Sequence, residues 1–250
     1  MHLILTGATG LVGSGVLHYM LTTPSITKIS ILSRRPVPMA EGHAKAHTII
    51  HKDYETYPSE LMAQLKDADG CVWAQGISQT KVGKEEYIEI THTYPLSFAR
   101  ALSSTTSPKP IPFIYVSGAG ATTNPGMFTP IFGVTKGRTE ADLLALSKDT
   151  TFSNLRPFSV RPAGVDAGAH EEILGYVPKK EGMERVMIST LLPVVKVVMP
   201  SFLTPTRGLG AVLSKMAMGN GEALTGTGVE AEGRTVNNVR ILEMAKEWQE

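Results

Sequence analysis

Short apolar runs alternate with longer segments of helical period along most of the chain. The apolar runs lie at residues 3–5, 29–32, 48–50, 71–74, 111–116 and 158–160. Between them, apolar side chains recur at helical spacing in residues 11–21, 84–102 and 139–146. Buried parallel strands appear as short continuous apolar runs, and helices usually connect them. The pattern therefore predicts an α/β fold, a doubly wound parallel sheet covered by helices.

The first apolar run leads into a glycine-rich turn, and a helical pattern follows it directly. The turn reads Thr6-Gly7-Ala8-Thr9-Gly10-Leu11-Val12-Gly13. Glycines allow a tight turn and let backbone N–H groups approach a pyrophosphate at the positive end of a helix. The turn lacks the Gly-Lys-Ser/Thr of a nucleoside-triphosphate loop. We therefore favour a dinucleotide site over a purely structural turn, with these cofactor-binding residues: Thr6, Gly7, Thr9, Gly10, Leu11, Val12 and Gly13.

The glycine turn makes the predicted sheet a Rossmann fold, and 250 residues suit a single domain of this kind. We assign 1–250 to one domain, with residues 1–166 as its dinucleotide-binding core. Residues 167–250 are less regular in pattern. They are expected to form a small irregular region on the substrate side, together with the C-terminal elements.

The residues after the second apolar run indicate which dinucleotide binds. An NAD site commonly places a carboxylate there, to accept a hydrogen bond from the ribose. In this chain Ser33, Arg34 and Arg35 occupy the position. Guanidinium groups form paired, charge-assisted bonds with phosphate, which favours NADP. The alternative is two solvated arginines before a proline-containing loop.

Two further segments belong to the expected cofactor site. Asp53 follows the third apolar run, where it either accepts a hydrogen bond from the adenine amino group or caps the next helix. Ala74, Gln75 and Gly76 end the fourth run, where the backbone passes close to the middle of the cofactor.

Together with Ser117 and Lys136, these motifs resemble those of the short-chain dehydrogenases/reductases. The chain is most similar to their atypical branch, with the Tat-interacting-protein and NmrA-like groups, and the resemblance runs from Met1 to about Asp166. It implies an NAD(P) site and a catalytic Ser–Tyr–Lys group. Ser117 and Lys136 match the serine and the lysine of that group. Lys136 is also expected to bind the hydroxyl groups of the nicotinamide ribose.

The tyrosine of that group is missing, because the position four residues before Lys136 is Phe132. A phenol has a proton to donate, and a nearby lysine lowers its pKa, whereas a phenyl ring has none. Ser117 either binds a substrate carbonyl or only ends its strand. Tyr115, Thr135, His170 and Tyr176 are weaker substitutes, for which packing or surface roles are the better interpretation.

Composition excludes several classes of partner and site. The net charge of +1 provides no field for nucleic acid. A single cysteine, Cys71, excludes an internal disulfide, and the histidines lack metal-ligand spacing, so no metal is expected. Proline and lysine interrupt the apolar segment 186–202, which is therefore expected to be buried or to line a pocket rather than span a membrane. Without a targeting signal, we expect a cytoplasmic protein.

The motifs favour an NADP-dependent oxidoreductase acting on a small or medium apolar carbonyl compound. Phe132 motivates an alternative, a cofactor-binding sensor or scaffold without redox chemistry. A cyclase, isomerase or lyase reusing the pocket is a weaker third hypothesis. In related proteins the helices corresponding to 83–102 and 129–148 often pair subunits, so a homodimer stays open.

Overall fold

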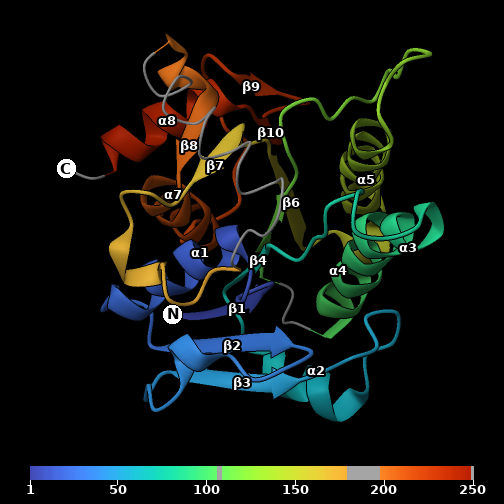
Figure 1. The fold of residues 1–250 in the computed structure, drawn as a ribbon. Helices are drawn as coiled ribbons and strands as arrows, with labels where there is room; N and C mark the ends of the chain where they lie inside the picture. Colours follow the sequence, from blue (N-terminus) through green and yellow to red (C-terminus); the bar gives the residue numbers. More distant parts are fainter. Residues whose placement is uncertain (106–108, 179–197, 249–250) are drawn as a thin grey trace.

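The structure is a computed structural model, and it describes residues 1–105, 109–178 and 198–248. An eight-stranded sheet forms its centre (Figure 1). Its strands are β1 (His2–Thr6), β2 (Lys28–Ser33), β3 (Ala46–Ile50), β4 (Gly70–Trp73), β5 (Ile111–Val116), β6 (Leu155–Val160), β9 (Val229–Glu230) and β10 (Thr235–Val236). Their spatial order is β3-β2-β1-β4-β5-β6-β10-β9. Every neighbouring pair is parallel except β10 and β9. The predicted doubly wound α/β fold is confirmed.

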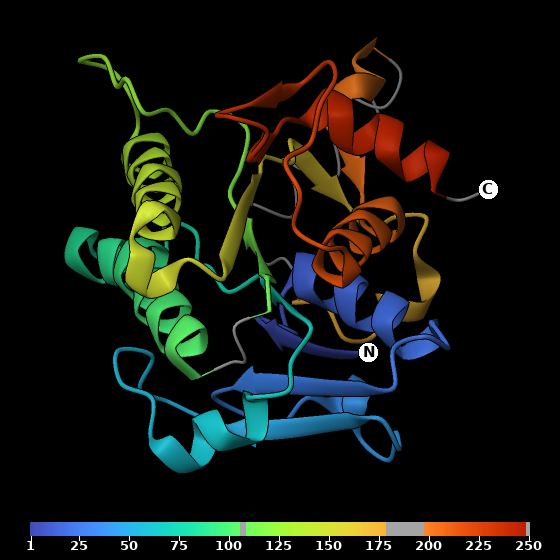
Figure 2. The same ribbon diagram turned by 180° about the vertical axis from the view of Figure 1, so that it is seen from behind.

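Helices cover both faces of the sheet (Figures 1 and 2). One layer contains α1 (Leu11–Thr22), α7 (Thr206–Met218) and α8 (Asn238–Glu247). The opposite layer contains α2 (Ser59–Leu65), α4 (Tyr94–Thr105) and α5 (Ile131–Lys148). Alternation along β1 explains the two cores, because Leu3 and Leu5 pack with the first layer and Ile4 with the second. The remaining elements are short: α3 (Lys84–Ile88), η1 (Pro38–Ala40), η3 (Thr150–Phe152), η4 (Glu171–Ile173), η5 (Pro200–Phe202), and the two-stranded sheet of β7 (Gly164–Asp166) and β8 (Leu203–Pro205).

The helix predicted over 84–102 is interrupted by a π-helical turn. That turn, η2 (Glu89–Thr93), separates α3 from α4 and lies just before Pro95. Proline has no N–H, so the helical bond that would end on the carbonyl oxygen of Thr91 is missing. This oxygen accepts instead from the Tyr115 hydroxyl and the Thr139 hydroxyl, each at 3.1 Å. The break therefore joins η2 to β5 and α5.

The C-terminal part contributes regular elements to the core. α7 packs along α1 through two glycines: a Cβ on Gly210 would lie 2.4 Å from the carbonyl oxygen of Gly15, and one on Gly15 would lie 2.8 Å from that of Thr206. β10 joins the sheet beside β6, with Val236 opposite Val160. Of the apolar segment at 186–202, residues 186–197 lie outside the described residues.

None of the described helices is long and apolar enough to cross a membrane.

Candidate functional site

A cavity of about 690 Å³ lies at the carboxyl ends of the central strands. In doubly wound folds, ligands bind at this edge of the sheet, where the strand order reverses. The lining comes from four loops and a few single residues: 10–12, 74–78, 115–119 and 162–165, with Lys81, Thr91, Lys136, Pro178 and Phe202.

The glycine turn after β1 forms one end of the cavity. Gly7 has a φ of +69°, which a glycine adopts readily, and a Cβ there would lie 2.3 Å from the carbonyl oxygen of Ala74. A Cβ on Gly13 would lie 2.0 Å from the carbonyl oxygen of Gly7. The buried Thr6 hydroxyl accepts a hydrogen bond from the backbone N–H of Gln75 at 3.3 Å. The turn therefore presses against the end of β4 and against the first turn of α1.

The start of α1 fits a bound pyrophosphate. Its N-cap is Gly10, which provides no side-chain hydrogen bond, and the first turn carries no acidic side chain. The first N–H groups of a helix have no intrahelical acceptor, and they attract an anion. The N–H of Gly10 donates to the Gly7 carbonyl oxygen at 2.9 Å, whereas Leu11 and Val12, the first residues of α1, line the cavity.

The three polar residues after the core of β2 lie close to the glycine turn. Ser33 is buried, and its hydroxyl accepts from the backbone N–H of Arg35 at 3.4 Å. The Arg35 guanidinium donates to the hydroxyl of Thr9 at 3.3 Å. Arg34 and Arg35 are both exposed. Although both arginines lie outside the cavity lining, the Arg35 guanidinium lies beside the turn that would hold a pyrophosphate.

Asp53 has a local structural role. Its carboxylate accepts from the Thr56 hydroxyl at 2.7 Å and from the Glu55 N–H at 2.9 Å. These two hydrogen bonds lower the pKa of the exposed Asp53 carboxyl, with the Thr56 bond having the larger effect. α2 begins only at Ser59, so Asp53 caps the turn before it rather than the helix. Asp53 does not line the cavity.

Ser117 and Lys136 meet at the centre of the cavity wall. The Ser117 hydroxyl is buried and has no hydrogen-bond partner among the described residues. Lys136 reaches from α5, and its ammonium donates to the carbonyl oxygen of Ser117 at 2.6 Å and more weakly to that of Val116 at 3.4 Å. Burial lowers the pKa of Lys136 to about 8, and the nearby Glu140 opposes this shift. An orphaned buried hydroxyl usually marks a missing partner.

Phe132 lies one turn before Lys136, but its ring is not part of the cavity lining. A Cβ on Gly120 would lie 3.2 Å from the tip of the ring, so the ring points at that loop. The backbone N–H of Phe132 donates to the Gln79 side chain at 3.0 Å. The side chain at the position of the family's tyrosine therefore points toward the loop at Gly120.

The structure places the other candidate donors away from the reaction space or engages them. Tyr115 lines the cavity, but its hydroxyl donates to Thr91, and burial raises its pKa. His170 lies in another pocket, of about 320 Å³, with its ring 2.8 Å from His18 and 3.0 Å from Thr206. Thr135 and Tyr176 do not line the cavity. The role of Thr91 was not predicted, although Pro95 four residues later is the signal that identifies it.

The predicted absence of a metal is examined in the described residues only. Within 1–105, 109–178 and 198–248, no group of three His, Cys, Asp or Glu side chains is placed to hold a metal ion. The absence of a metal stays a prediction.

No family model matches the chain. A curated relative matches it. "Leucinostatins biosynthesis cluster protein T" of Purpureocillium lilacinum is 32% identical over an aligned length of 257, and the alignment covers 96% of this chain and 93% of that protein. The chain belongs to the family of that protein. A second relative, "Protein FMP52, mitochondrial" of Candida albicans, is 29% identical over 158 residues, or 63% of this chain and 66% of that protein. Because this relative is named mitochondrial, the cytoplasmic location stays a prediction.

Solved structures identify the fold. A short-chain dehydrogenase/reductase family oxidoreductase from Burkholderia thailandensis superimposes with a TM-score of 0.63 at 14% identity, over 99% of this chain and 96% of that one. The Bordetella bronchiseptica enzyme WbmF, solved in complex with NAD+, has a TM-score of 0.65 at 13% identity, over 99% of this chain and 77% of that one. The predicted resemblance to short-chain dehydrogenases/reductases is confirmed at the level of the fold.

Proposed function

We propose that the chain is an NADP-dependent oxidoreductase that reduces a small or medium apolar carbonyl compound. The observation that carries the proposal is the buried, unpartnered Ser117 hydroxyl beside Lys136, in a cavity that begins at an uncapped helix N-terminus. This hydroxyl lacks a partner, and a rotation of the Ser117 side chain toward the cavity would let it donate a hydrogen bond to a substrate carbonyl oxygen.

The residues of the cavity suit the parts of a nicotinamide dinucleotide in order. The N–H groups of Leu11 and Val12, at the start of α1, would bind the pyrophosphate. Lys136 would bind the hydroxyl groups of the nicotinamide ribose. A bound reduced nicotinamide supplies a hydride. The NAD+ complex of WbmF, which has the same fold, supports this assignment.

The wall around Ser117 favours an apolar substrate. Beyond the polar pair, the lining is formed mainly by small or apolar side chains: Val116, Ala119, Pro162, Ala163, Val165 and Phe202. A pocket of this kind binds through apolar contact and uses a few polar groups for orientation. Ser117 would orient the carbonyl group in this way.

Selectivity for the cofactor tests the NADP part of the proposal. We expect NADPH to bind more tightly than NADH, because Arg34 and Arg35 suit the 2′-phosphate. Arg35→Ala should weaken NADPH about 10- to 100-fold, the range expected for losing one charge-assisted contact of about 1.5–3 kcal/mol. NADH affinity should stay within about twofold. Calorimetric titration with both dinucleotides measures these constants.

Arg100→Ala is the matched control, because Arg100 is exposed on α4 and does not line the cavity. It should leave both affinities unchanged. Equal binding of the two dinucleotides by the unaltered chain would contradict NADP selectivity. Binding of neither would remove the cofactor assignment itself.

Phe132 supports one alternative, a dinucleotide-binding sensor or scaffold without redox chemistry. The two functions differ in turnover. The reductase oxidises NADPH with some member of a panel of apolar ketones and aldehydes, whereas the sensor binds NADPH and consumes none.

Phe132→Tyr is expected to change the reduction rate by less than about threefold. Tyrosine at this position in the family supplies a proton, an effect worth about 10²- to 10⁴-fold. Here the ring tip lies beside Gly120, outside the cavity lining, so the new hydroxyl would not reach the substrate. Initial rates of NADPH oxidation test this. A hundredfold gain would show that the ring turns into the cavity.

A further inference from the structure

Reduction of a carbonyl compound needs a proton for the new alcohol, and few groups in the cavity are able to supply one. Three titratable side chains line it among the described residues: Lys81, Tyr115 and Lys136. Lys81 is exposed. The Tyr115 hydroxyl already donates a hydrogen bond to the carbonyl oxygen of Thr91, and its raised pKa makes it a poor acid. Lys136 is the remaining interior acid.

The ammonium group of Lys136 lies at the cavity wall, next to Ser117. It lies against the Ser117–Gly118 segment, because it donates to the Ser117 carbonyl oxygen and a Cβ on Gly118 would lie 3.8 Å from Nζ. Its two described acceptors are backbone oxygens, and an ammonium has three protons to donate. No phenol stands between Lys136 and the cavity, because the corresponding side chain, Phe132, is turned toward Gly120.

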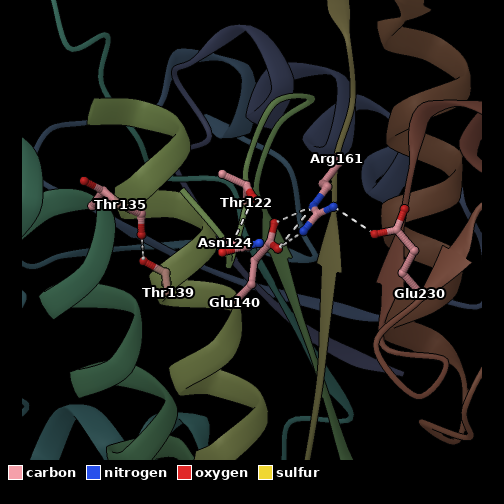
Figure 3. Close-up of polar contacts among 7 residues, drawn as sticks. All are labelled: Thr122, Asn124, Thr135, Thr139, Glu140, Arg161 and Glu230. Atoms are coloured by element: carbon pink, nitrogen blue, oxygen red, sulfur yellow. Dashed lines mark hydrogen bonds and ion pairs between the residues drawn. The ribbon is translucent and has the colours of Figure 1, made fainter. Parts of the chain in front are cut away.

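Glu140 favours the charged form of Lys136 without pairing with it directly, whereas burial disfavours that form and has the larger effect. Glu140 lies one turn later on α5, is buried, and acts on Lys136 through space. Figure 3 shows Glu140 facing Arg161, whose guanidinium donates to both carboxylate oxygens and, on its other side, to Glu230 at 3.0 Å. The carboxylates of Glu140 and Glu230 balance the positive charges of Arg161 and Lys136. Tyr115 on β5 adds only a neutral hydroxyl. Burial and Glu140 therefore oppose each other in setting the acidity of Lys136.

We propose that Lys136 itself donates the proton to the substrate's carbonyl oxygen, in place of the missing tyrosine. This inference rests on the proposed reduction. The carbonyl carbon accepts a hydride from the reduced dinucleotide, and the electron pair of the C=O π bond takes a proton from the ammonium. An alcohol, an oxidised dinucleotide and a neutral Lys136 amine result. The amine regains its proton from water entering the cavity.

Lys136→Arg separates charge from acidity, because a guanidinium stays protonated above pH 12. In the unaltered chain, kcat should fall tenfold per pH unit above about pH 8, as the ammonium loses its proton. In the arginine variant, kcat at pH 7 should fall about 10²- to 10⁴-fold. The alkaline limb should vanish, and the Kd for NADPH should change by less than about fivefold. Lys148→Arg, on the exposed end of the same helix, should change none of these values.

A measurement without cofactor tests the acid directly. Competitive acetylation of the apo chain between pH 6 and 11, read by mass spectrometry, should show Lys136 titrating near pH 8. If Lys136→Arg does not fold, Lys136→Met removes the charge and the acid together, and the acetylation profile of the unaltered chain then tests the acidity of Lys136 by itself.

The outcomes distinguish the two proposals. Turnover that persists in Lys136→Arg with the same alkaline limb overturns the role of Lys136 and leaves the reductase intact. A Lys136 that titrates above pH 10 also argues against it. An unaltered chain that binds NADPH but reduces no carbonyl compound removes the reductase, and the donor role with it.

Discussion

Gly13→Ala is expected to abolish measurable NADPH binding and to lower the free energy of unfolding by about 3 kcal/mol, the upper part of the range for overpacking a tight site. The added Cβ would lie 2.0 Å from the Gly7 carbonyl oxygen and 2.5 Å from its carbonyl carbon. These are backbone atoms, so no side chain can rotate away. The glycine turn and the first turn of α1 must separate, which moves the N–H groups that would bind the pyrophosphate. Urea denaturation and calorimetric titration measure the two effects.

Gly76→Ala is the matched control for stability, because Gly76 lines the same cavity and a Cβ there meets no atom within 4 Å. Its free energy of unfolding should stay within about 0.5 kcal/mol of the unaltered chain. If Gly13→Ala folds with normal stability and binds NADPH normally, the turn is not the anion site and the cofactor assignment fails at its first residue.

The glycine turn is also the part of the site that sequence predicts best. All the information lies within eight residues: a strand, three spaced glycines and a helix, each dictated by local backbone requirements. The six predicted strands and α1 match the structure for the same reason, since apolar runs and helical periods are local signals.

What sequence does not predict depends on contacts between distant segments. The freed carbonyl oxygen of Thr91 is set by Pro95, but its new donors come from β5 and α5. Asp53 shows the converse: two alternatives fit its position, and only the bonds to Glu55 and Thr56 reveal a turn cap. The direction of the Phe132 ring depends on the loop at Gly120. The sequence gives the residue type at each position, whereas the direction in which its side chain points depends on segments that only the fold brings together.

Arg161→Met is expected to lower the free energy of unfolding by about 3–5 kcal/mol, because it leaves a buried carboxylate without its partner. The Arg161 and Glu140 side chains are 16% and 3% exposed, and the Arg161 Nε donates to Glu140 Oε1 at 3.0 Å and to Oε2 at 3.1 Å. Arg207→Met is the control, since Arg207 pairs with Glu172 at the surface, where both side chains are about half exposed. It should cost less than about 1 kcal/mol. Urea denaturation of both variants makes the comparison.

The double variant Glu140→Met/Arg161→Met connects this ion pair to the chemistry of the cavity. Replacing both partners with apolar side chains of similar size removes the unpaired charge, so most of the lost stability should return. Glu140 raises the pKa of Lys136 and burial lowers it, so removing Glu140 leaves burial unopposed and the pKa should fall. The alkaline limb of the reduction should then move to lower pH. The acetylation profile of Lys136 should move in the same direction, with or without cofactor. A double variant that regains stability but keeps the original pH profile would show that the Glu140–Arg161 pair holds β6 to α5 and has no influence on the proton donor.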